Sequence, residues 1–250
     1  MITADSTELR SEGRAVLRYT PTLESSPTAD LAEPLVSVDE VVPVVLDELA
    51  GWHIATANEE FSSALLAAGC TPVRHGHLYS RDLVASPPEA GWLSPDLGPL
   101  VLSPIDRAAA DFVKVSLAAY PPGHPDTETA DPAVVERFVE VLLTGESVGP
   151  FMGVSAQVTD GADVVGVTII NRVSGMAPLG GPWVSEVCRV PDPRYAGLGA
   201  AMLRHVMAGL QALEETSLSL VVTESNPARN AYERLGFCHI ESFRKVLIPA

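Results

Sequence analysis

A short loop of small residues stands between a predicted strand and a predicted helix, and it reads Arg194-Tyr195-Ala196-Gly197-Leu198-Gly199-Ala200. The first turn of a helix has backbone N–H groups without intrahelical partners, and the helix dipole adds partial positive charge there. The two glycines would allow phosphate oxygens to approach closely, while Arg194 could pair with a phosphate or simply lie on the surface. A plain strand-to-helix turn that needs two glycines fits equally well, so this loop alone indicates phosphate binding only weakly.

A second polar segment follows the next predicted strand and reads Thr223-Glu224-Ser225-Asn226-Pro227-Ala228-Arg229-Asn230-Ala231-Tyr232-Glu233-Arg234-Leu235-Gly236-Phe237. The loop RYAGLG resembles the pyrophosphate-binding segment of GNAT acetyltransferases, commonly written Q/R-x-x-G-x-G/A. The stretch NPARNAYERLGF resembles the second signature of the same superfamily, N…Y…GF. The two motifs stand in the family's order and spacing, and the resemblance covers about residues 100–250.

The resemblance implies that the protein uses an acyl-CoA, usually acetyl-CoA. It implies that backbone groups of Cys188-Arg189-Val190 bind the pantetheine arm and that N–H groups from Tyr195 to Ala200 hold the pyrophosphate. Asn226 would contact the cofactor, and Tyr232 would donate a proton to the leaving thiolate. Many family members have glycine where this chain has Tyr195, which predicts a wider loop.

The chemistry of acyl transfer explains these residue types, since amine attack on a thioester develops charge on an oxygen and then expels a thiolate. Tyr232 is therefore a candidate general acid, although a core aromatic beside Phe237 is the alternative. Glu186, on the strand before the loop, is a candidate general base that would take a proton from the amine directly or through water. A solvated strand residue is an equally open interpretation of Glu186.

Tyr120 and His124 lie in a segment rich in proline, where this family commonly lines its acceptor pocket. His124 could bind or deprotonate an acceptor. For a lone histidine in such a loop, however, we expect first a structural role, with the ring bonded to the backbone or to Asp126.

The elements that would position these residues alternate between helix and strand. We predict helices over 108–120, 132–143 and 228–235 and from Leu198 to Leu213, and strands over 155–159, 164–172, 183–190, 218–223 and 238–248. This order predicts an α/β protein. The resemblance narrows it to the GNAT fold, a mixed central sheet flanked by helices, here with a smaller α/β N-terminal subdomain.

In the first half of the sequence we predict a helix from near Pro43 to Leu49, a strand over 52–56, a helix over 59–68 and an extended arm over 71–79. Residues 86–104 are rich in Pro and Gly, which predicts a domain boundary there. We therefore expect a tail or extended segment over 1–35, a partial, non-catalytic GNAT-like subdomain over 36–97 and a GNAT acetyltransferase domain over 98–250. The order of elements in 38–80 repeats that of 199–248, but without a glycine-rich loop and without a matching tyrosine.

Composition excludes several classes of function. The formal charge of −16 would repel a phosphate backbone, so nucleic acid is not an expected partner. The same charge would attract an amine, or it serves only solubility. Apolar stretches are too short to span a membrane, and the N-terminus does not resemble a secretory signal, so we expect a cytoplasmic protein without a membrane partner. The three cysteines are widely separated, which predicts buried thiols and no metal site.

These observations predict an acyl-CoA-dependent N-acyltransferase that moves acetyl from acetyl-CoA to a small-molecule primary amine by direct attack in a ternary complex. The same fold acting with a longer acyl-CoA is one alternative. A non-catalytic acyl-CoA-binding or regulatory module is another. A homodimer follows only from analogy with relatives that pair through terminal strands.

Overall fold

A computed structural model describes residues 6–22, 27–127, 130–146 and 148–250. The chain forms two compact units. Unit 1 comprises Met1–Leu78 and Glu241–Ala250, and unit 2 comprises Tyr79–Ile240. The chain passes from unit 1 into unit 2 within strand β5 (Thr71–Asp82), and it returns within strand β11 (Cys238–Leu247).

Unit 1 is a small α/β unit. Its elements are β1 (Thr7–Ser11), β2 (Arg14–Thr22), β3 (Thr28–Pro34), α1 (Val38–Glu48), β4 (His53–Thr56) and α2 (Glu59–Ala67), with β11 beside β4. The strands β3 and β4 are parallel, and the other pairs β1–β2, β2–β3 and β4–β11 are antiparallel. The segment expected as a tail or extended segment thus supplies three paired strands, because side chains such as Leu17 and Ala29 are fully buried in the core of unit 1.

Helix α1 begins at Val38, earlier than the predicted start near Pro43. Val41 and Val45 lie one helical turn apart and are both fully buried, so an earlier start places two valines in the core. Pro43 consequently lies inside the helix, where it removes one backbone hydrogen bond. Pro43 suits a first-turn position and so predicts the later start, whereas the spacing of Val41 and Val45 requires the earlier one.

Unit 2 is built on a mixed sheet with the strand order β5-β10-β9-β8-β7-β6. Its strands are β6 (Val101–Pro104), β7 (Ala156–Asp160), β8 (Asp163–Val173), β9 (Gly181–Arg189) and β10 (Ser217–Thr223). Its helices are α3 (Ala110–Ala119), α4 (Pro132–Thr144), α5 (Leu198–Ala212) and α6 (Arg229–Arg234), with short 3-10 helices at Ala90–Leu93 and Pro193–Tyr195. Strands β6 to β9 are antiparallel neighbours and β10 is parallel to β9, which confirms the predicted mixed α/β class.

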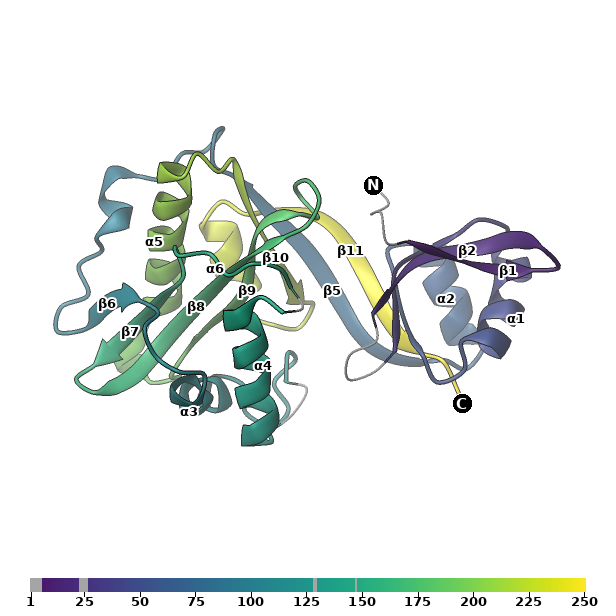
Figure 1. The fold of residues 1–250 in the computed structure, drawn as a ribbon, viewed down its shortest axis with the longest axis horizontal. Helices are drawn as coiled ribbons and strands as arrows, with labels where there is room; N and C mark the ends of the chain where they lie inside the picture. The colour runs from purple at the N-terminus through teal and green to yellow at the C-terminus, as the bar shows by residue number, and fades with distance from the viewer. Residues whose placement is uncertain (1–5, 23–26, 128–129, 147) are drawn as a thin grey trace. The chain divides into compact units, whose positions relative to one another are not determined.

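Helices cover both faces of this sheet (Figure 1). Neighbouring residues of β8 show the alternation: Ile169 packs with α3 and α4, whereas Ile170 packs with α5. Because successive side chains of a strand point to opposite faces, each strand contributes to two cores. Tyr120 and His124 belong to the loop that follows α3, on the same side of the sheet as this helix.

The proline-rich segment 86–104 does not separate the two units. The ring of Trp92 lies 5.2 Å from the guanidinium of Arg81 and 5.6 Å from that of Arg204 on α5. His205 donates from Nδ1 to the carbonyl of Leu93 at 2.7 Å, and β6 pairs with β7. The compact units therefore differ from the predicted division at 35 and 97, and the role of residues 36–97 as a non-catalytic GNAT-like subdomain stays a prediction.

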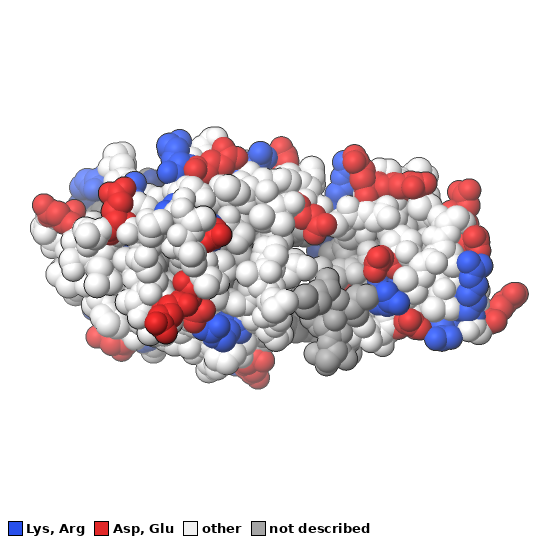
Figure 2. All heavy atoms as spheres, turned by 90° about the horizontal axis from the view of Figure 1, so that it is seen from above, with Lys and Arg blue, Asp and Glu red and all other residues white. Residues whose placement is uncertain are grey.

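One face of the molecule carries both signs of charge. On the face shown in Figure 2, Asp and Glu occur in small groups with Lys and Arg among them. Within the described ranges, none of the helices is long and apolar enough to cross a membrane.

Candidate active site

A β-bulge in β9 sets the direction of Glu186. Ile169 of β8 pairs with Glu186 and the adjacent Ile170 pairs with Val184, so Ser185 is the extra residue in β9. In a regular strand Val184 and Glu186 would point to the same face. With the bulge, Val184 packs in the core beneath α5, while Glu186 is directed to the end of α3 and is only 7% exposed.

Tyr120 at the C-terminal end of α3 holds the Glu186 carboxylate. Its hydroxyl donates to Oε1 of Glu186 at 2.5 Å and lies 3.4 Å from the carbonyl oxygen of Val187. Burial raises the pKa of Glu186 to about 7 and the negative charge of Asp126 adds to this, while hydrogen bonds from Tyr120 and from the Val187 backbone act in the opposite direction. Burial also raises the pKa of Tyr120 well above its usual value, so its hydroxyl stays a donor. Glu186 can therefore exchange a proton near neutral pH.

The loop after α3 is closed by its own hydrogen bonds. Thr127 donates from its hydroxyl to the carbonyl of Tyr120 at 3.1 Å. The rings of Tyr120 and His124 meet edge to face at 5.0 Å between centroids, and Nδ1 of His124 accepts from the backbone N–H of Asp126 at 3.2 Å. The ring of His124 is thus bonded to the backbone, as expected for a structural role. The role of His124 in binding an acceptor stays a prediction.

Asp126 connects this loop to the second signature. One carboxylate oxygen accepts from the hydroxyl of Thr223 at the end of β10, and the other accepts from the side-chain amide of Asn226. The sequence indicates Asp126 only as a partner of the His124 ring. An aspartate in a proline-rich loop carries no sign in the sequence that it meets residues 97 and 100 positions further on.

Tyr232 lies on α6, half-buried, with its ring 6.0 Å from that of Phe237 in an edge-to-face contact. Burial raises the pKa of the Tyr232 hydroxyl, and the negative charges of Glu186 and Asp126 raise it further. The tyrosine therefore packs as a core aromatic would, and its hydroxyl also lies within electrostatic reach of both carboxyl groups. The structure brings Tyr120, Glu186 and Tyr232 together, as the acid–base assignment requires.

Strands β9 and β10 separate beside this cluster. Their register pair is Trp183 opposite Ser219, near the start of β9, and from there to Arg189 the described residues show no further pairing between these two strands. Cys188 is buried, and the N–H of Val190 bonds the carbonyl of Val165 on the other side at 2.9 Å. The edge of β9 that faces β10 is therefore open in the segment expected to bind a pantetheine arm.

The loop before α5 has the features of a phosphate cradle. Gly197 has φ 83°, and the first hydrogen bond of the helix runs from the N–H of Ala201 to the carbonyl of Gly197 at 3.0 Å. Of the donors expected from Tyr195 to Ala200, the N–H groups of Tyr195 and Ala196 bond the carbonyls of Asp192 and Pro193 instead. The N–H groups of residues 198–200 precede the first helical bond and have no helical partner. The first turn has no acidic residue, and a Cβ placed on Gly197 or Gly199 would meet no atom within 4 Å. Accessible donors and open space over the glycines fit a pyrophosphate.

Tyr195 anchors the phosphate loop instead of opening it. Its side chain is 6% exposed and packs with Leu198 and Val158, and its hydroxyl donates to Oδ2 of Asp160 at 2.9 Å. The expected wider loop is not required, because the aromatic ring points into the core. The guanidinium of Arg194 lies at the surface in an ion pair with Asp192 at 2.9 Å, and its pairing with a phosphate stays a prediction.

Asn226 forms the turn that begins α6. Its Oδ1 accepts from the N–H of Ala228 at 2.8 Å, while its amide group donates to Asp126. Its predicted contact with the cofactor stays a prediction. The expectation of buried thiols is right for Cys70 and Cys188 and wrong for Cys238, which is exposed where β11 begins.

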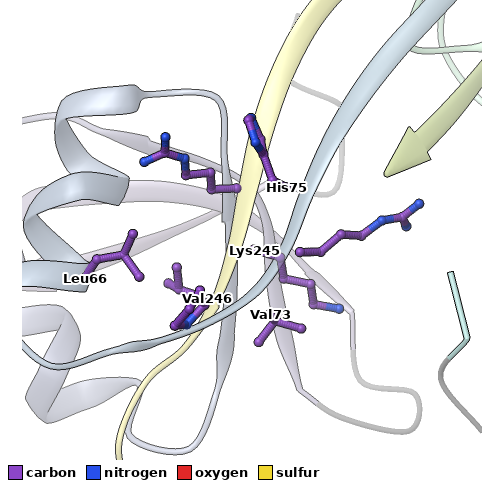
Figure 3. Close-up of a pocket in the computed structure, with 8 residues that line it drawn as sticks. Leu66, Val73, His75, Lys245 and Val246 are labelled. Atoms are coloured by element: carbon purple, nitrogen blue, oxygen red, sulfur yellow. The ribbon is translucent and has the colours of Figure 1, made fainter. Parts of the chain in front are cut away.

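Unit 1 contains two cavities of its own. The smaller, about 200 Å³, lies along β5 and β11, with Val73, His75 and Lys245 shown in Figure 3 together with Leu66 and Val246. The larger, about 410 Å³, is lined by Thr56, Ala57, Glu59, Ser62, His75, Glu241, Ser242, Phe243 and Arg244. None of the residues predicted for catalysis or for cofactor binding lines either cavity.

Comparison with known proteins gives one family match and several similar folds. Residues 175–246, which include both motifs, match the family model described as FR47-like protein. No curated protein matches the chain in sequence.

Three solved structures illustrate the structural likeness. A GCN5-related N-acetyltransferase from Sphaerobacter thermophilus is 14% identical, with a TM-score of 0.66 over 96% of this chain and 79% of that one. A tandem GNAT protein from the clavulanic acid biosynthesis pathway is 14% identical, with a TM-score of 0.61 over 100% and 85%. A GCN5-related N-acetyltransferase from Kribbella flavida is 16% identical, with a TM-score of 0.57 over 94% and 87%.

At these identities the likeness establishes the fold. The chain has the GNAT fold, and the resemblance to the GNAT superfamily predicted from the two motifs is confirmed.

Proposed function

We propose that this protein is an acyl-CoA-dependent N-acyltransferase that moves an acetyl group from acetyl-CoA to a small-molecule primary amine. One observation carries the proposal: a buried glutamate, bonded to Tyr120 at 2.5 Å and with a pKa of about 7, lies within electrostatic reach of the second-signature tyrosine. A carboxyl group with a pKa near 7 can accept a proton from an ammonium group near neutral pH, which is what this reaction needs of its base.

The residues present fit the cofactor that the fold implies. The N–H groups of residues 198–200 would hold the pyrophosphate, and the open edge of β9 from Val187 to Arg189 would bind the pantetheine amides as an added strand does. When bound, acetyl-CoA supplies an acyl group activated as a thioester. The finer assignment of acetyl over a longer acyl group rests on the usual cofactor of proteins with this fold.

The chain's own groups would then move two protons. Glu186 at Oε2 or Oε1 accepts a proton from the substrate ammonium, directly or through water, and Tyr120 keeps its side chain in place throughout. Tyr232 would hold the proton that its raised pKa retains and would supply it to the departing sulfur, and the second proton that the nitrogen loses as the amide forms would replace it. Acid and base lie on different elements, so both can act while amine and thioester are bound in one ternary complex.

A non-catalytic acyl-CoA sensor is the competing function. It needs the phosphate loop and the open strand edge, but it makes no use of a carboxyl group that can exchange a proton near pH 7. An assay of thiol release from acetyl-CoA with a panel of primary amines separates the two functions. Amine-dependent release that is lost in Glu186→Gln supports the enzyme, and tight acetyl-CoA binding without release on any amine supports the sensor.

A further inference from the structure

We propose that Asp126 is a positioning residue that joins the loop after α3 to the turn before α6 and thereby fixes Glu186 and Tyr232 relative to each other. Its catalytic consequence rests on the proposed function, while its effect on the geometry of the site does not.

Three segments that are distant in the sequence meet at this one carboxylate. Asp126 belongs to the loop after α3, and its two oxygens accept from Thr223 at the end of β10 and from Asn226 before α6. Thr223 is 8% exposed, so the contact lies at the edge of the core. Each oxygen serves a different element, and a neutral amide in its place would keep only one accepting oxygen for the two contacts.

Hydrogen bonds and a ring contact extend from Asp126 toward the base. The Asp126 N–H bonds the ring of His124, which contacts Tyr120, and Thr127 donates to the carbonyl of Tyr120. Tyr120 in turn holds Glu186 at 2.5 Å. A short series of contacts therefore links the position of Asp126 to the position of Glu186.

Similar bonds extend toward the acid. Asn226 uses Oδ1 to accept from the N–H of Ala228 and its carbonyl to accept from the N–H of Arg229. The N–H of Tyr232 donates to the carbonyl of Ala228 at 3.1 Å. Because α6 has less than two turns of its own, the turn that Asn226 forms determines where Tyr232 lies.

Asp126 also acts through its charge. Within the part of the chain that the structure describes, four groups interact electrostatically with Glu186: Tyr120 from the end of α3, Tyr232 from α6, Cys188 from its own strand and Asp126 from the loop. Among these, Asp126 is the carboxylate, and its charge opposes ionisation of Glu186. Its removal should therefore lower the pKa of Glu186, whereas removal of a hydrogen bond with a purely structural role should lower only the melting temperature.

The test uses the full chain with carbon-13 in its glutamate carboxyl groups, and the Glu186 signal is assigned by its loss in Glu186→Gln. The titration midpoint of Glu186 is measured by NMR in the wild type, in Asp126→Asn and in the matched control Asp131→Asn. Asp131 lies just before α4 in the same segment between α3 and α4, and its carboxylate caps that helix by accepting from the N–H of Ala133. Expected is a lower midpoint in Asp126→Asn and an unchanged midpoint in the control.

The double variant Asp126→Asn with Asn226→Asp restores the hydrogen bond with the negative charge moved to position 226. It exchanges donor and acceptor across the same contact, and the carboxylate introduced at position 226 would still accept from the N–H of Ala228. Expected is at least a tenfold loss of kcat in the single variant with an unchanged Kd for acetyl-CoA, and recovery of most of that loss in the double variant.

An unchanged Glu186 midpoint in a folded Asp126→Asn protein would overturn the proposal, as would a double variant no better than the single one. The NMR midpoint needs no turnover. A shifted midpoint in a protein that acetylates no amine would therefore reject the proposed function while leaving the electrostatic effect of Asp126 on Glu186 intact.

Discussion

Substitution of Glu186 by Gln should inactivate the protein and stabilise it at alkaline pH. The amide keeps an oxygen for the Tyr120 hydroxyl, so the contact at 2.5 Å can persist, but it cannot accept a proton from an amine. General base catalysis contributes about 10²–10⁴-fold, and kcat should fall by that factor. The wild-type rate should itself fall below pH 7, where the carboxylate becomes protonated.

The stability effect follows from linkage. Folding raises the pKa of Glu186 from 4.5 to about 7, so the folded state binds this proton more tightly than the unfolded state. The contribution of Glu186 to stability is therefore complete below pH 4.5 and is lost as the pH rises through 7. A difference of this size corresponds to roughly 3 kcal/mol, at about 1.4 kcal/mol for each tenfold change in acidity.

The comparison between wild type and Glu186→Gln must be made at two pH values. The amide also loses one of two accepted bonds, but that cost does not depend on pH. Between about pH 4.5 and pH 8 the variant should therefore gain roughly 3 kcal/mol relative to wild type, or about 6–12 °C in melting temperature for a chain of this size. A difference in melting temperature that is the same at both pH values would refute the raised pKa, and full activity would refute the role as base.

Three further substitutions and one binding measurement test the rest of the site. Tyr232→Phe keeps the ring against Phe237 and removes the acid. The kcat should therefore fall about 10²–10⁴-fold with little change in acetyl-CoA affinity, and an unaltered rate of the chemical step would contradict the acid role. Gly197→Asp places a charge and a Cβ at φ 83° beside the pyrophosphate, and calorimetry should show a severe loss of acetyl-CoA affinity. Gly197→Ala adds the Cβ without the charge, so its loss of affinity should be smaller. Tyr195→Phe removes the bond to Asp160 and should cost about 1 kcal/mol in denaturant unfolding, and an unchanged midpoint would argue against the anchoring role. Calorimetry should find one acetyl-CoA per chain, since the first half lacks a glycine-rich loop, and a stoichiometry of two would disprove this.

The sequence predicted those elements whose apolar spacing or turn residues are local. Helix α5 follows from the spacing of Met202, Leu203, Val206 and Leu210, all buried, and the β7–β8 hairpin follows from the turn at Asp160–Asp163. The start of α1 was predicted too late, because Pro43 is a strong local signal and the burial of Val41 depends on tertiary packing.

The site was predicted in its parts rather than in its connections. Glu186 and Tyr232 were recognised by type and position, but the bulge at Ser185 that directs Glu186 depends on register with β8, which no local pattern reports. The bond from Tyr195 to Asp160 and the contacts of Asp126 join residues far apart in the sequence. Such contacts become visible only once the strands are placed.

The most direct test of the central claim is a single-turnover experiment with excess protein, acetyl-CoA carrying carbon-13 in its acetyl group, and a primary amine found in the thiol-release panel. Direct transfer in a ternary complex predicts that the label passes from the thioester to the amine at the rate of thiol release, without residence on the protein. Mass spectrometry of the quenched mixture should accordingly find acetylated amine and unmodified chain at every time. Label that stays on the thioester, or that first appears on a protein side chain, would contradict the proposed mechanism.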